Sequence, residues 1–172
     1  EMKTLLLALE GARGGQALLL AIEGEAGLGK SRLKWEISRV AREMGFGVHE
    51  GGARAFGGSA YGPVAELVLS TLDLHGRSSA KDVQASVERR ARDLGLAGSD
   101  SHHLADILGV RPSPSPLDHL DAKAIRLNDM IALRGYLGAE ARVAPRLYVL
   151  EAMHWADELT RAAVEAMALA PD

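Results

Sequence analysis

The stretch LLLAIEGEAGLGKSRLKWEI, residues 18–37, decides the fold of this chain. It begins with a short run of apolar residues bounded by glycine, which predicts a buried strand over residues 16–23. It then passes through a loop of small residues into a segment whose apolar residues recur with helical spacing, which predicts a helix over residues 30–44. A buried strand, a glycine-rich turn and an amphipathic helix in this order are typical of a parallel α/β sheet.

The turn in this stretch, residues 24–31, reads GEAGLGKS and matches the G-x-x-x-x-G-K-S pattern of a phosphate-binding loop. Small residues let the backbone curl so that successive N–H groups can face one anion, and the next helix directs its positive end at the same place. Lys30 can then contact the β- and γ-phosphates, and the Ser31 hydroxyl can ligate Mg²⁺. The alternative is an ordinary glycine-rich turn, but the strand before it and the helix after it favour the phosphate site.

We therefore expect ATP or ADP to bind with Mg²⁺ in this loop. The predicted nucleotide-binding residues are Gly24, Glu25, Ala26, Gly27, Leu28, Gly29, Lys30, Ser31 and Arg32.

A carboxylate ends a second apolar segment, RLYVLE, which predicts a strand over residues 146–151. Ligands of open α/β sheets bind at the carboxyl ends of the strands. Glu151 is therefore predicted to orient the metal ion, together with Ser31, and to be the catalytic residue in this sense. The alternative is a solvent-exposed acid that merely ends a strand.

The rest of the chain predicts further helices and one more strand. The expected helices cover residues 2–13, 63–74, 81–94, 101–108, 117–140 and 158–170, and the expected strand covers residues 47–52. Residues 53–62 and the proline-rich residues 109–118 predict loops. The basic cluster ERRAR, residues 88–92, is interpreted as the solvated face of a helix. This order of elements predicts a parallel sheet flanked by helices.

Composition narrows the class of protein. The chain has 172 residues, 47% of them apolar, which suits one domain over residues 1–172. The formal net charge of −3 argues against direct nucleic-acid contact, and the lack of cysteine excludes disulfides and thiolate metal sites. No apolar run approaches the roughly 20 residues of a membrane span, so we expect no membrane contact. The lack of cysteine fits the cytoplasmic location that we expect.

The residues that follow Glu151 extend the motif to AMHWAD, residues 152–157. Together with EGEAGLGKSRL and with Tyr61-Gly62-Pro63, this pattern resembles the signal-transduction ATPases with numerous domains, the STAND class. The resemblance is strongest to the AAA-like ATPase modules of large LuxR-type transcriptional regulators and of multidomain adenylate cyclases. It implies a three-layer P-loop NTPase fold, with phosphates and Mg²⁺ at the loop and with Glu151 holding the metal through water.

The chain departs from that family at one position. The family's second acid polarises the attacking water, but here the position is Ala152, and a methyl group cannot accept a proton. Nucleotide binding should survive this change, while hydrolysis should be slow unless Glu151, His154 or Asp157 takes over. Simpler roles are expected for the last two, with Asp157 as a helix N-cap and His154 packed at the helix start. Trp155 is expected to anchor the core.

Some elements of the resembled fold do not fall within residues 1–172. The later strands, one of which lies between the first strand and the Glu151 strand, and the helical lid would follow Asp172, and the adenine-holding element would precede Glu1. The domain therefore looks truncated. We expect weak affinity, and either self-association, a rearranged strand order or contacts with other domains of a longer chain.

Three functions remain open at this point. Ala152 favours a regulatory ATP/ADP switch with weak or slow hydrolysis. The alternatives are a competent ATPase and a phosphotransferase of the small-molecule kinase type. The phosphotransferase would place the Glu151 strand directly beside the first strand, and the His-Trp-Ala-Asp stretch argues against it.

Overall fold

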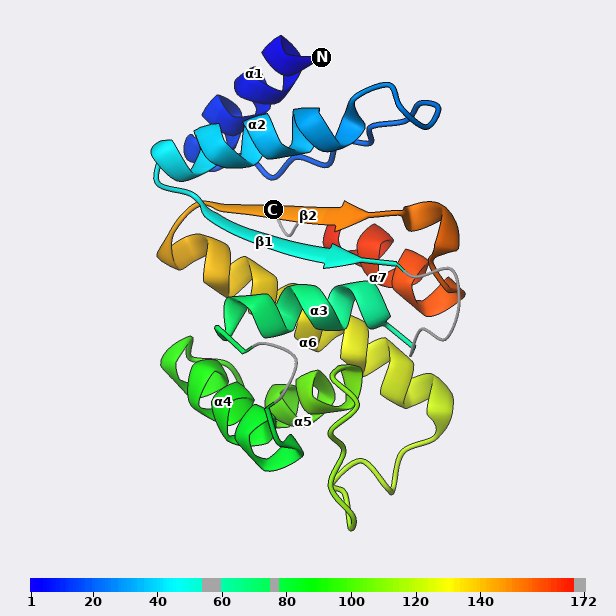
Figure 1. Cartoon of the computed structure of the whole chain (residues 1–172). Helices are drawn as coiled ribbons and strands as arrows, with labels where there is room; N and C mark the ends of the chain where they lie inside the picture. The colour runs from blue at the N-terminus through cyan, green and yellow to red at the C-terminus, as the bar shows by residue number, and fades with distance from the viewer. Residues whose placement is uncertain (54–59, 75–77, 169–172) are drawn as a thin grey trace.

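A computed structural model describes residues 1–53, 60–74 and 78–168 of the chain (Figure 1). The elements in chain order are α1 Met2–Arg13, α2 Lys30–Glu43, β1 Gly47–Gly52, α3 Gly62–Thr71, α4 Ala80–Asp93, α5 Gly98–Ile107, α6 Ala122–Val143, β2 Arg146–Glu151, the 3₁₀ turn η1 Met153–Trp155 and α7 Glu158–Ala168. The predicted helices are confirmed, with ends shifted by a few residues. The glycine-rich loop predicted over residues 53–62 lies largely outside the described residues.

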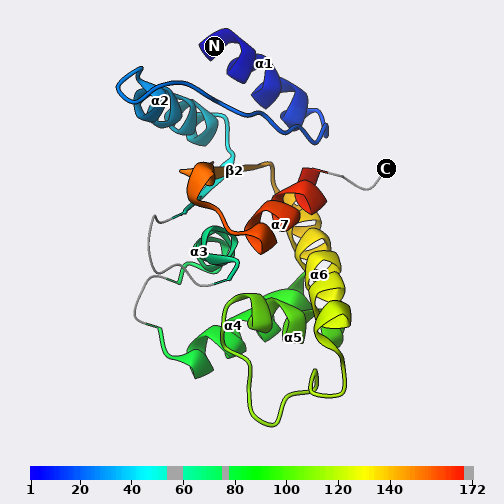
Figure 2. The same ribbon diagram turned by 90° about the vertical axis from the view of Figure 1, so that its right-hand side faces the viewer.

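The sheet of the described structure consists of β1 and β2, which run parallel. Their register pairs Gly47 with Arg146 at one end and Gly52 with Glu151 at the other. Helices α1 and α2 lie over one face of this sheet, and α3, α6 and α7 lie over the other (Figures 1 and 2). Helices α4 and α5 pack outside this second layer. The prediction of an α/β fold with a parallel sheet flanked by helices is confirmed.

Local signals in the sequence set the helix boundaries. Asp121 accepts hydrogen bonds from the amides of Lys123 at 2.9 Å and Ala124 at 2.8 Å, so α6 begins at Ala122 and not at residue 117 as predicted. Helix α4 begins with a reciprocal capping box between Ser79 and Asp82. Asp118, at the start of the predicted helix, instead accepts hydrogen bonds from the Ser115 amide and from Arg111, so the helix starts after Asp121.

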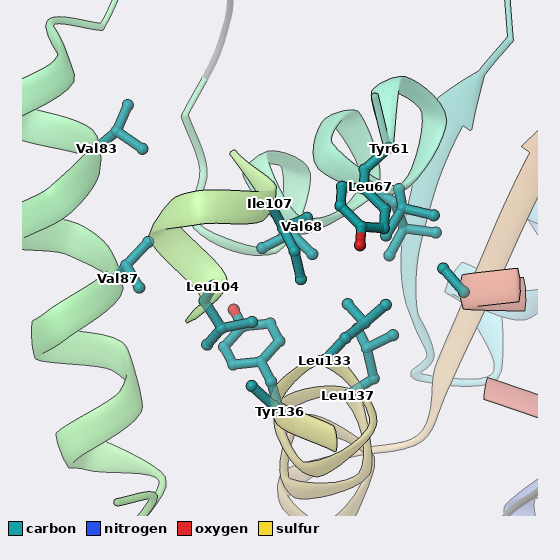
Figure 3. Packing of buried hydrophobic residues seen from close by; sticks show 13 residues of the cluster. Tyr61, Leu67, Val68, Val83, Val87, Leu104, Ile107, Leu133, Tyr136 and Leu137 are labelled. Atoms are coloured by element: carbon teal, nitrogen blue, oxygen red, sulfur yellow. The ribbon is translucent and has the colours of Figure 1, made fainter. Parts of the chain in front are cut away.

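The largest core lies between α3, α4, α5 and α6 (Figure 3). Its members pack side chains from all four helices, and they include Tyr61, Leu67, Val68, Val83, Val87, Leu104, Ile107, Leu133, Tyr136 and Leu137. A second, smaller core consists of Leu9, Ile37, Ala41 and Phe46, with Val48 and Leu147 of the sheet packed against it. The helix that follows the phosphate loop is thus held by apolar contacts to α1 and to the sheet.

The strand predicted over residues 16–23 is wrong. These residues form no strand, and their side chains are exposed, with Leu19 at 63% and Leu18 at 53%. A strand buried in a parallel sheet needs hydrogen-bonded neighbours, and β1 and β2 of the described structure pair with each other alone. Residues 16–23 therefore have the apolar sequence pattern of a strand but pair with neither β1 nor β2. Because the two strands keep their own pairing, the described sheet also gives no sign of a rearranged strand order.

We predict that Leu133→Ala lowers the free energy of unfolding by about 2–5 kcal/mol, because Leu133 is fully buried in the larger core. Leu127→Ala on the same helix is the matched control, since that side chain is 61% exposed and its loss should change stability by less than about 0.5 kcal/mol. Urea denaturation measures both. Equal losses in the two variants would contradict the position assigned to this core.

Candidate functional site

The phosphate loop, residues 24–31, adopts a conformation that depends on its glycines. Gly24, Gly27 and Gly29 have φ angles of +157°, +87° and +85°. A Cβ at Gly27 or Gly29 would meet nothing within 4 Å, so the requirement for glycine there comes from the backbone conformation and not from crowding. The sequence of three such glycines in eight residues lets the chain curl ahead of α2.

Lys30 closes this loop. Its ammonium group donates hydrogen bonds to the carbonyl oxygens of Gly24 and Glu25, both at 2.6 Å. An ammonium has three N–H donors, so one remains for a ligand. The contact holds the start of the loop against its end.

The N-terminus of α2 faces the same loop and is not capped. Gly29 is its N-cap residue, and no side chain accepts a hydrogen bond from its first turn. The first amides of an α-helix have no partner within the helix, and the helix dipole gives that end a positive partial charge. The helix N-terminus and Lys30 would therefore both favour an anion at this place.

Glu151, the predicted metal-orienting acid, lies at the carboxyl end of β2 and is exposed. The Nζ atom of Lys34 lies 3.0 Å from Oε2 of Glu151 and 2.9 Å from Oε2 of Glu50, which is on β1. The hydrogen bonds to Glu50 and then to Glu151 raise the pKa of Lys34. Lys34 lies one helical turn beyond Lys30. The Lys34–Glu151 ion pair therefore places the phosphate loop near the carboxyl ends of the strands, where Glu151 lies.

Sequence reasoning missed Lys34 and Glu50. The available signal was their position, because Lys34 follows Lys30 by four residues on one helix face and Glu50 lies near the end of a predicted strand.

Mg²⁺ is compatible with this arrangement. The ion is usually held by one or two carboxylates together with substrate phosphates, and Glu151 and the Ser31 hydroxyl are oxygen donors of this kind. No group of three or more His, Asp or Glu side chains suited to a metal occurs in the described part of the chain. A metal at this edge would therefore need the nucleotide's own oxygens.

The residues after Glu151 lack a free proton acceptor at the expected position. Ala152 has φ 55° and ψ 35°, a left-handed conformation that costs energy for a residue with a Cβ. His154 and Trp155 are exposed, with ring centroids 5.0 Å apart. The prediction that Trp155 anchors the core is wrong, because the side chain lies on the 3₁₀ turn η1 and is 52% exposed.

Asp157 is the N-cap of α7, as predicted. Its Oδ1 accepts a hydrogen bond from the Thr160 amide at 2.8 Å, and its Oδ2 accepts one from the Thr160 hydroxyl at 2.8 Å. Partial burial acts to raise the pKa of Asp157, but the hydrogen bonds from Thr160 outweigh it and the pKa is lowered. Both carboxylate oxygens are engaged, so Asp157 is a poor substitute for the missing general base.

Tyr61 of the Tyr-x-Pro step belongs to the core and not to the site. It is buried, and its hydroxyl donates to Asp129, which also pairs with His103 at 2.8 Å. Burial raises the pKa of Tyr61 well above its ordinary value.

Comparison with known proteins adds a family and one relative. A family model described as the AAA ATPase domain matches residues 1–171. An uncharacterized protein of Rhizobium meliloti (strain 1021) is 31% identical over 167 residues, which cover 94% of this chain but only 16% of the relative. No solved structure matches the chain. Among the described residues, no helix combines the length and the apolar character needed to cross a membrane.

Asp157→Ala is expected to lower the free energy of unfolding by about 1 kcal/mol near neutral pH through loss of the cap. Because the pKa of Asp157 is lowered in the folded state, its stabilising contribution is present above the unfolded pKa and disappears as the pH falls through the folded pKa. Parent and variant should therefore converge in acid. Chemical denaturation across pH 2–7 measures this, and a difference that persists at the acid end would contradict it. Asp157→Asn, which keeps a capping oxygen, should cost less.

Proposed function

Because the chain belongs to the AAA ATPase domain family, we propose that it is the nucleotide-binding module of a larger regulatory protein, one that binds Mg-ATP and hydrolyses it slowly. The observation that carries this proposal is the closed phosphate loop. Three glycines with positive φ, the Lys30 contacts at 2.6 Å and an uncapped helix N-terminus converge on one place. Each feature alone is common, but together they form a cradle for a chain of phosphates.

Magnesium belongs to the same proposal. When bound, the ion neutralises charge on the phosphate oxygens. The Ser31 hydroxyl and the Glu151 carboxylate would hold it, the latter through water. Lys34 must release Glu151 for this to happen, and Glu50 gives the ammonium group a second carboxylate on which to remain. Nucleotide loading would in this way change how α2 is held against the sheet.

Slow hydrolysis follows from the side chains that surround the proposed water position. Ala152 offers no proton acceptor, both oxygens of Asp157 bond Thr160, and Glu151 would be engaged with the metal ion. General-base catalysis contributes about 10²–10⁴-fold to rate, so its loss suits a timer or switch better than a fast ATPase. The phosphotransferase alternative would place the first strand directly beside β2, and the His-Trp-Ala-Asp stretch argues against it.

The wider context is also a proposal. We infer a STAND-type module, as in LuxR-type regulators or multidomain cyclases, that works in the cytoplasm and receives its signal from other domains. The chain spans 16% of the length of its Rhizobium relative, which is compatible with such an arrangement. The exposed apolar residues Leu18, Leu19 and Ile22 would then contact another domain or a second copy.

Lys30→Ala should weaken the binding of Mg-ATP and Mg-ADP by about 10- to 100-fold, the loss expected for a charge-assisted hydrogen bond of about 1.5–3 kcal/mol. Isothermal titration calorimetry measures the affinity, and the exposed Lys123→Ala is the control for loss of a surface charge. Thermal unfolding of both variants establishes that they are folded. Unchanged affinity in folded Lys30→Ala would overturn the nucleotide site.

Ala152→Asp should raise the rate of phosphate release from ATP about tenfold or more by restoring a proton acceptor. Ala152→Asn is the matched control, because Asn and Asp both tolerate the left-handed backbone at this position, whereas only Asp can act as a base. Phosphate release is followed under single-turnover conditions. Rates equal to the parent for Asp, or an equal gain for Asn, would defeat the argument that the base is missing.

A further inference from the structure

A polar cleft lies at the amino ends of the two strands, which is the end of the sheet opposite the phosphate loop. It has a volume of about 360 Å³ and is lined by His49, Thr71, Leu72, Asp73, Ser86, Arg89, Arg90, Asp93 and Arg146. Arg146, which lines the cleft, is the first residue of β2, and Glu151, at the proposed nucleotide site, is the last. At the usual rise per residue of a strand, these two residues are about 17 Å apart. The nucleotide site does not use any of these side chains.

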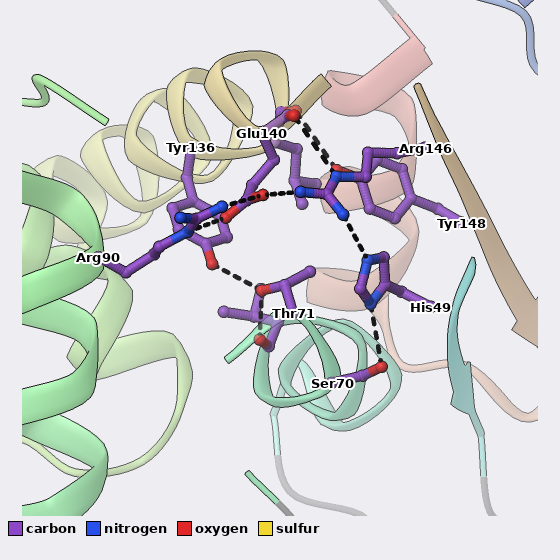
Figure 4. Close-up of polar contacts among 10 residues, drawn as sticks. His49, Ser70, Thr71, Arg90, Tyr136, Glu140, Arg146 and Tyr148 are labelled. Atoms are coloured by element: carbon purple, nitrogen blue, oxygen red, sulfur yellow. Dashed lines mark hydrogen bonds and ion pairs between the residues drawn. The ribbon is translucent and has the colours of Figure 1, made fainter. Parts of the chain in front are cut away.

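The floor of the cleft is built around Glu140 of α6, whose side chain has no solvent exposure (Figure 4). Arg90 of α4 donates to its two oxygens at 2.5 and 2.7 Å, and Arg146 of β2 donates to Oε2 at 2.6 Å. Two guanidinium groups thus share one carboxylate. The floor carries one positive charge in excess, and Arg90 departs from the solvated face predicted for residues 88–92.

His49 does not change this balance. Its Nδ1 lies 3.2 Å from the Ser70 hydroxyl and its Nε2 lies 3.4 Å from Arg146 (Figure 4). Burial, and then the positive charge of Arg146, lower the pKa of His49. The imidazole is therefore neutral at pH 7, and the excess charge of the floor remains.

The rim of the cleft carries both signs of charge. Asp73 and Asp93 are exposed and form no ion pair with any described residue. Arg89 is also exposed, and in the described structure its guanidinium bonds only the Ser86 hydroxyl, at 3.4 Å. Among the described residues, two carboxylates and one guanidinium without an ion-pair partner therefore line the cleft together with the positive floor.

We propose that this cleft binds a small zwitterion that carries one carboxylate and one ammonium group, that is, a free amino acid. The ligand carboxylate would pair with the guanidinium groups that line the cleft, those of Arg89, Arg90 and Arg146, because a planar guanidinium matches a carboxylate in geometry and charge. The ammonium would pair with Asp73 or Asp93, the two carboxylates of the same lining.

Simpler ligands fit less well. A lone anion would face Asp73 and Asp93, and a lone cation would face three guanidinium groups. The volume matches the lower range of small-molecule sites. The site is separate from the proposed nucleotide site and does not depend on it.

The test is calorimetric titration of the 172-residue chain, without nucleotide, with glycine, L-alanine, L-glutamate and γ-aminobutyrate. Propionate, propylamine and inorganic phosphate are the single-charge probes. At least one zwitterion should bind about tenfold or more tightly than propionate, propylamine and phosphate, since each of these lacks one of the two charge-assisted contacts.

The double variant Asp73→Asn with Asp93→Asn should lose about tenfold or more of the zwitterion affinity and keep or improve that for propionate. Asn suits the left-handed backbone at Asp73, where φ is 54°, and Asp93 is the last, exposed residue of α4, so the variant should fold. Arg89→Gln should weaken zwitterions and propionate alike, whereas Arg92→Gln, on the same helix but outside the cleft, should change neither.

Three outcomes would overturn the proposal: no binding of any zwitterion to folded parent chain, equal binding of zwitterions to the Asn double variant, or tighter binding of phosphate than of every amino acid. Lys30→Ala should leave amino-acid binding unchanged, so that a failure here and a failure of the nucleotide site are distinguished.

Discussion

The position of the phosphate loop relative to the sheet depends on the ammonium group of Lys34. Apolar contacts of α2 with α1, Val48 and Leu147 hold the helix near the sheet, but such contacts have little directional preference. The contacts of Lys34 with Glu50 and Glu151 define which turn of the helix lies over the strand ends. A partly exposed ion pair of this kind contributes only about 0–1 kcal/mol, so a ligand can rearrange it at little cost.

The opposite edge of the sheet follows a different physical rule. Glu140 is fully buried and pairs with two guanidinium groups, so its removal would leave both without this carboxylate, whereas removal of one arginine would leave the other to pair with Glu140. Arg90 and Arg146 come from separate elements, which ties α4 to the start of β2 through α6. The carboxyl end of the sheet is therefore held by the weak contacts of Lys34, and the amino end by the ion pairs of Glu140. The proposed nucleotide site lies at the first end and the proposed amino-acid site at the second.

Much of this structure could be predicted from local sequence. The phosphate loop, the strand that ends at Glu151 and the cap at Asp157 each depend on neighbours within a few residues, and each appears where the pattern places it. Residues 16–23 could not be read correctly, because an apolar run predicts a strand only if neighbours are available to pair with it. Trp155 was misplaced for a related reason, since hydrophobicity alone does not say which side of a 3₁₀ turn faces the core. The contacts of Lys34, Glu50, Arg90 and Glu140 join residues far apart in sequence, and only the fold brings them together.

The two tryptophans of the chain are close in sequence to the two residues of the Lys34–Glu151 ion pair. Trp35 follows Lys34 directly on α2, and Trp155 lies four residues beyond Glu151; both indole rings are exposed, at 60% and 52%. Their emission therefore starts from a water-exposed environment, and any movement that covers this edge shifts the emission toward shorter wavelength. The protein thus carries an intrinsic optical reporter at the end of the sheet that Lys34 holds, while the Glu140 end contains no indole and stays spectroscopically silent.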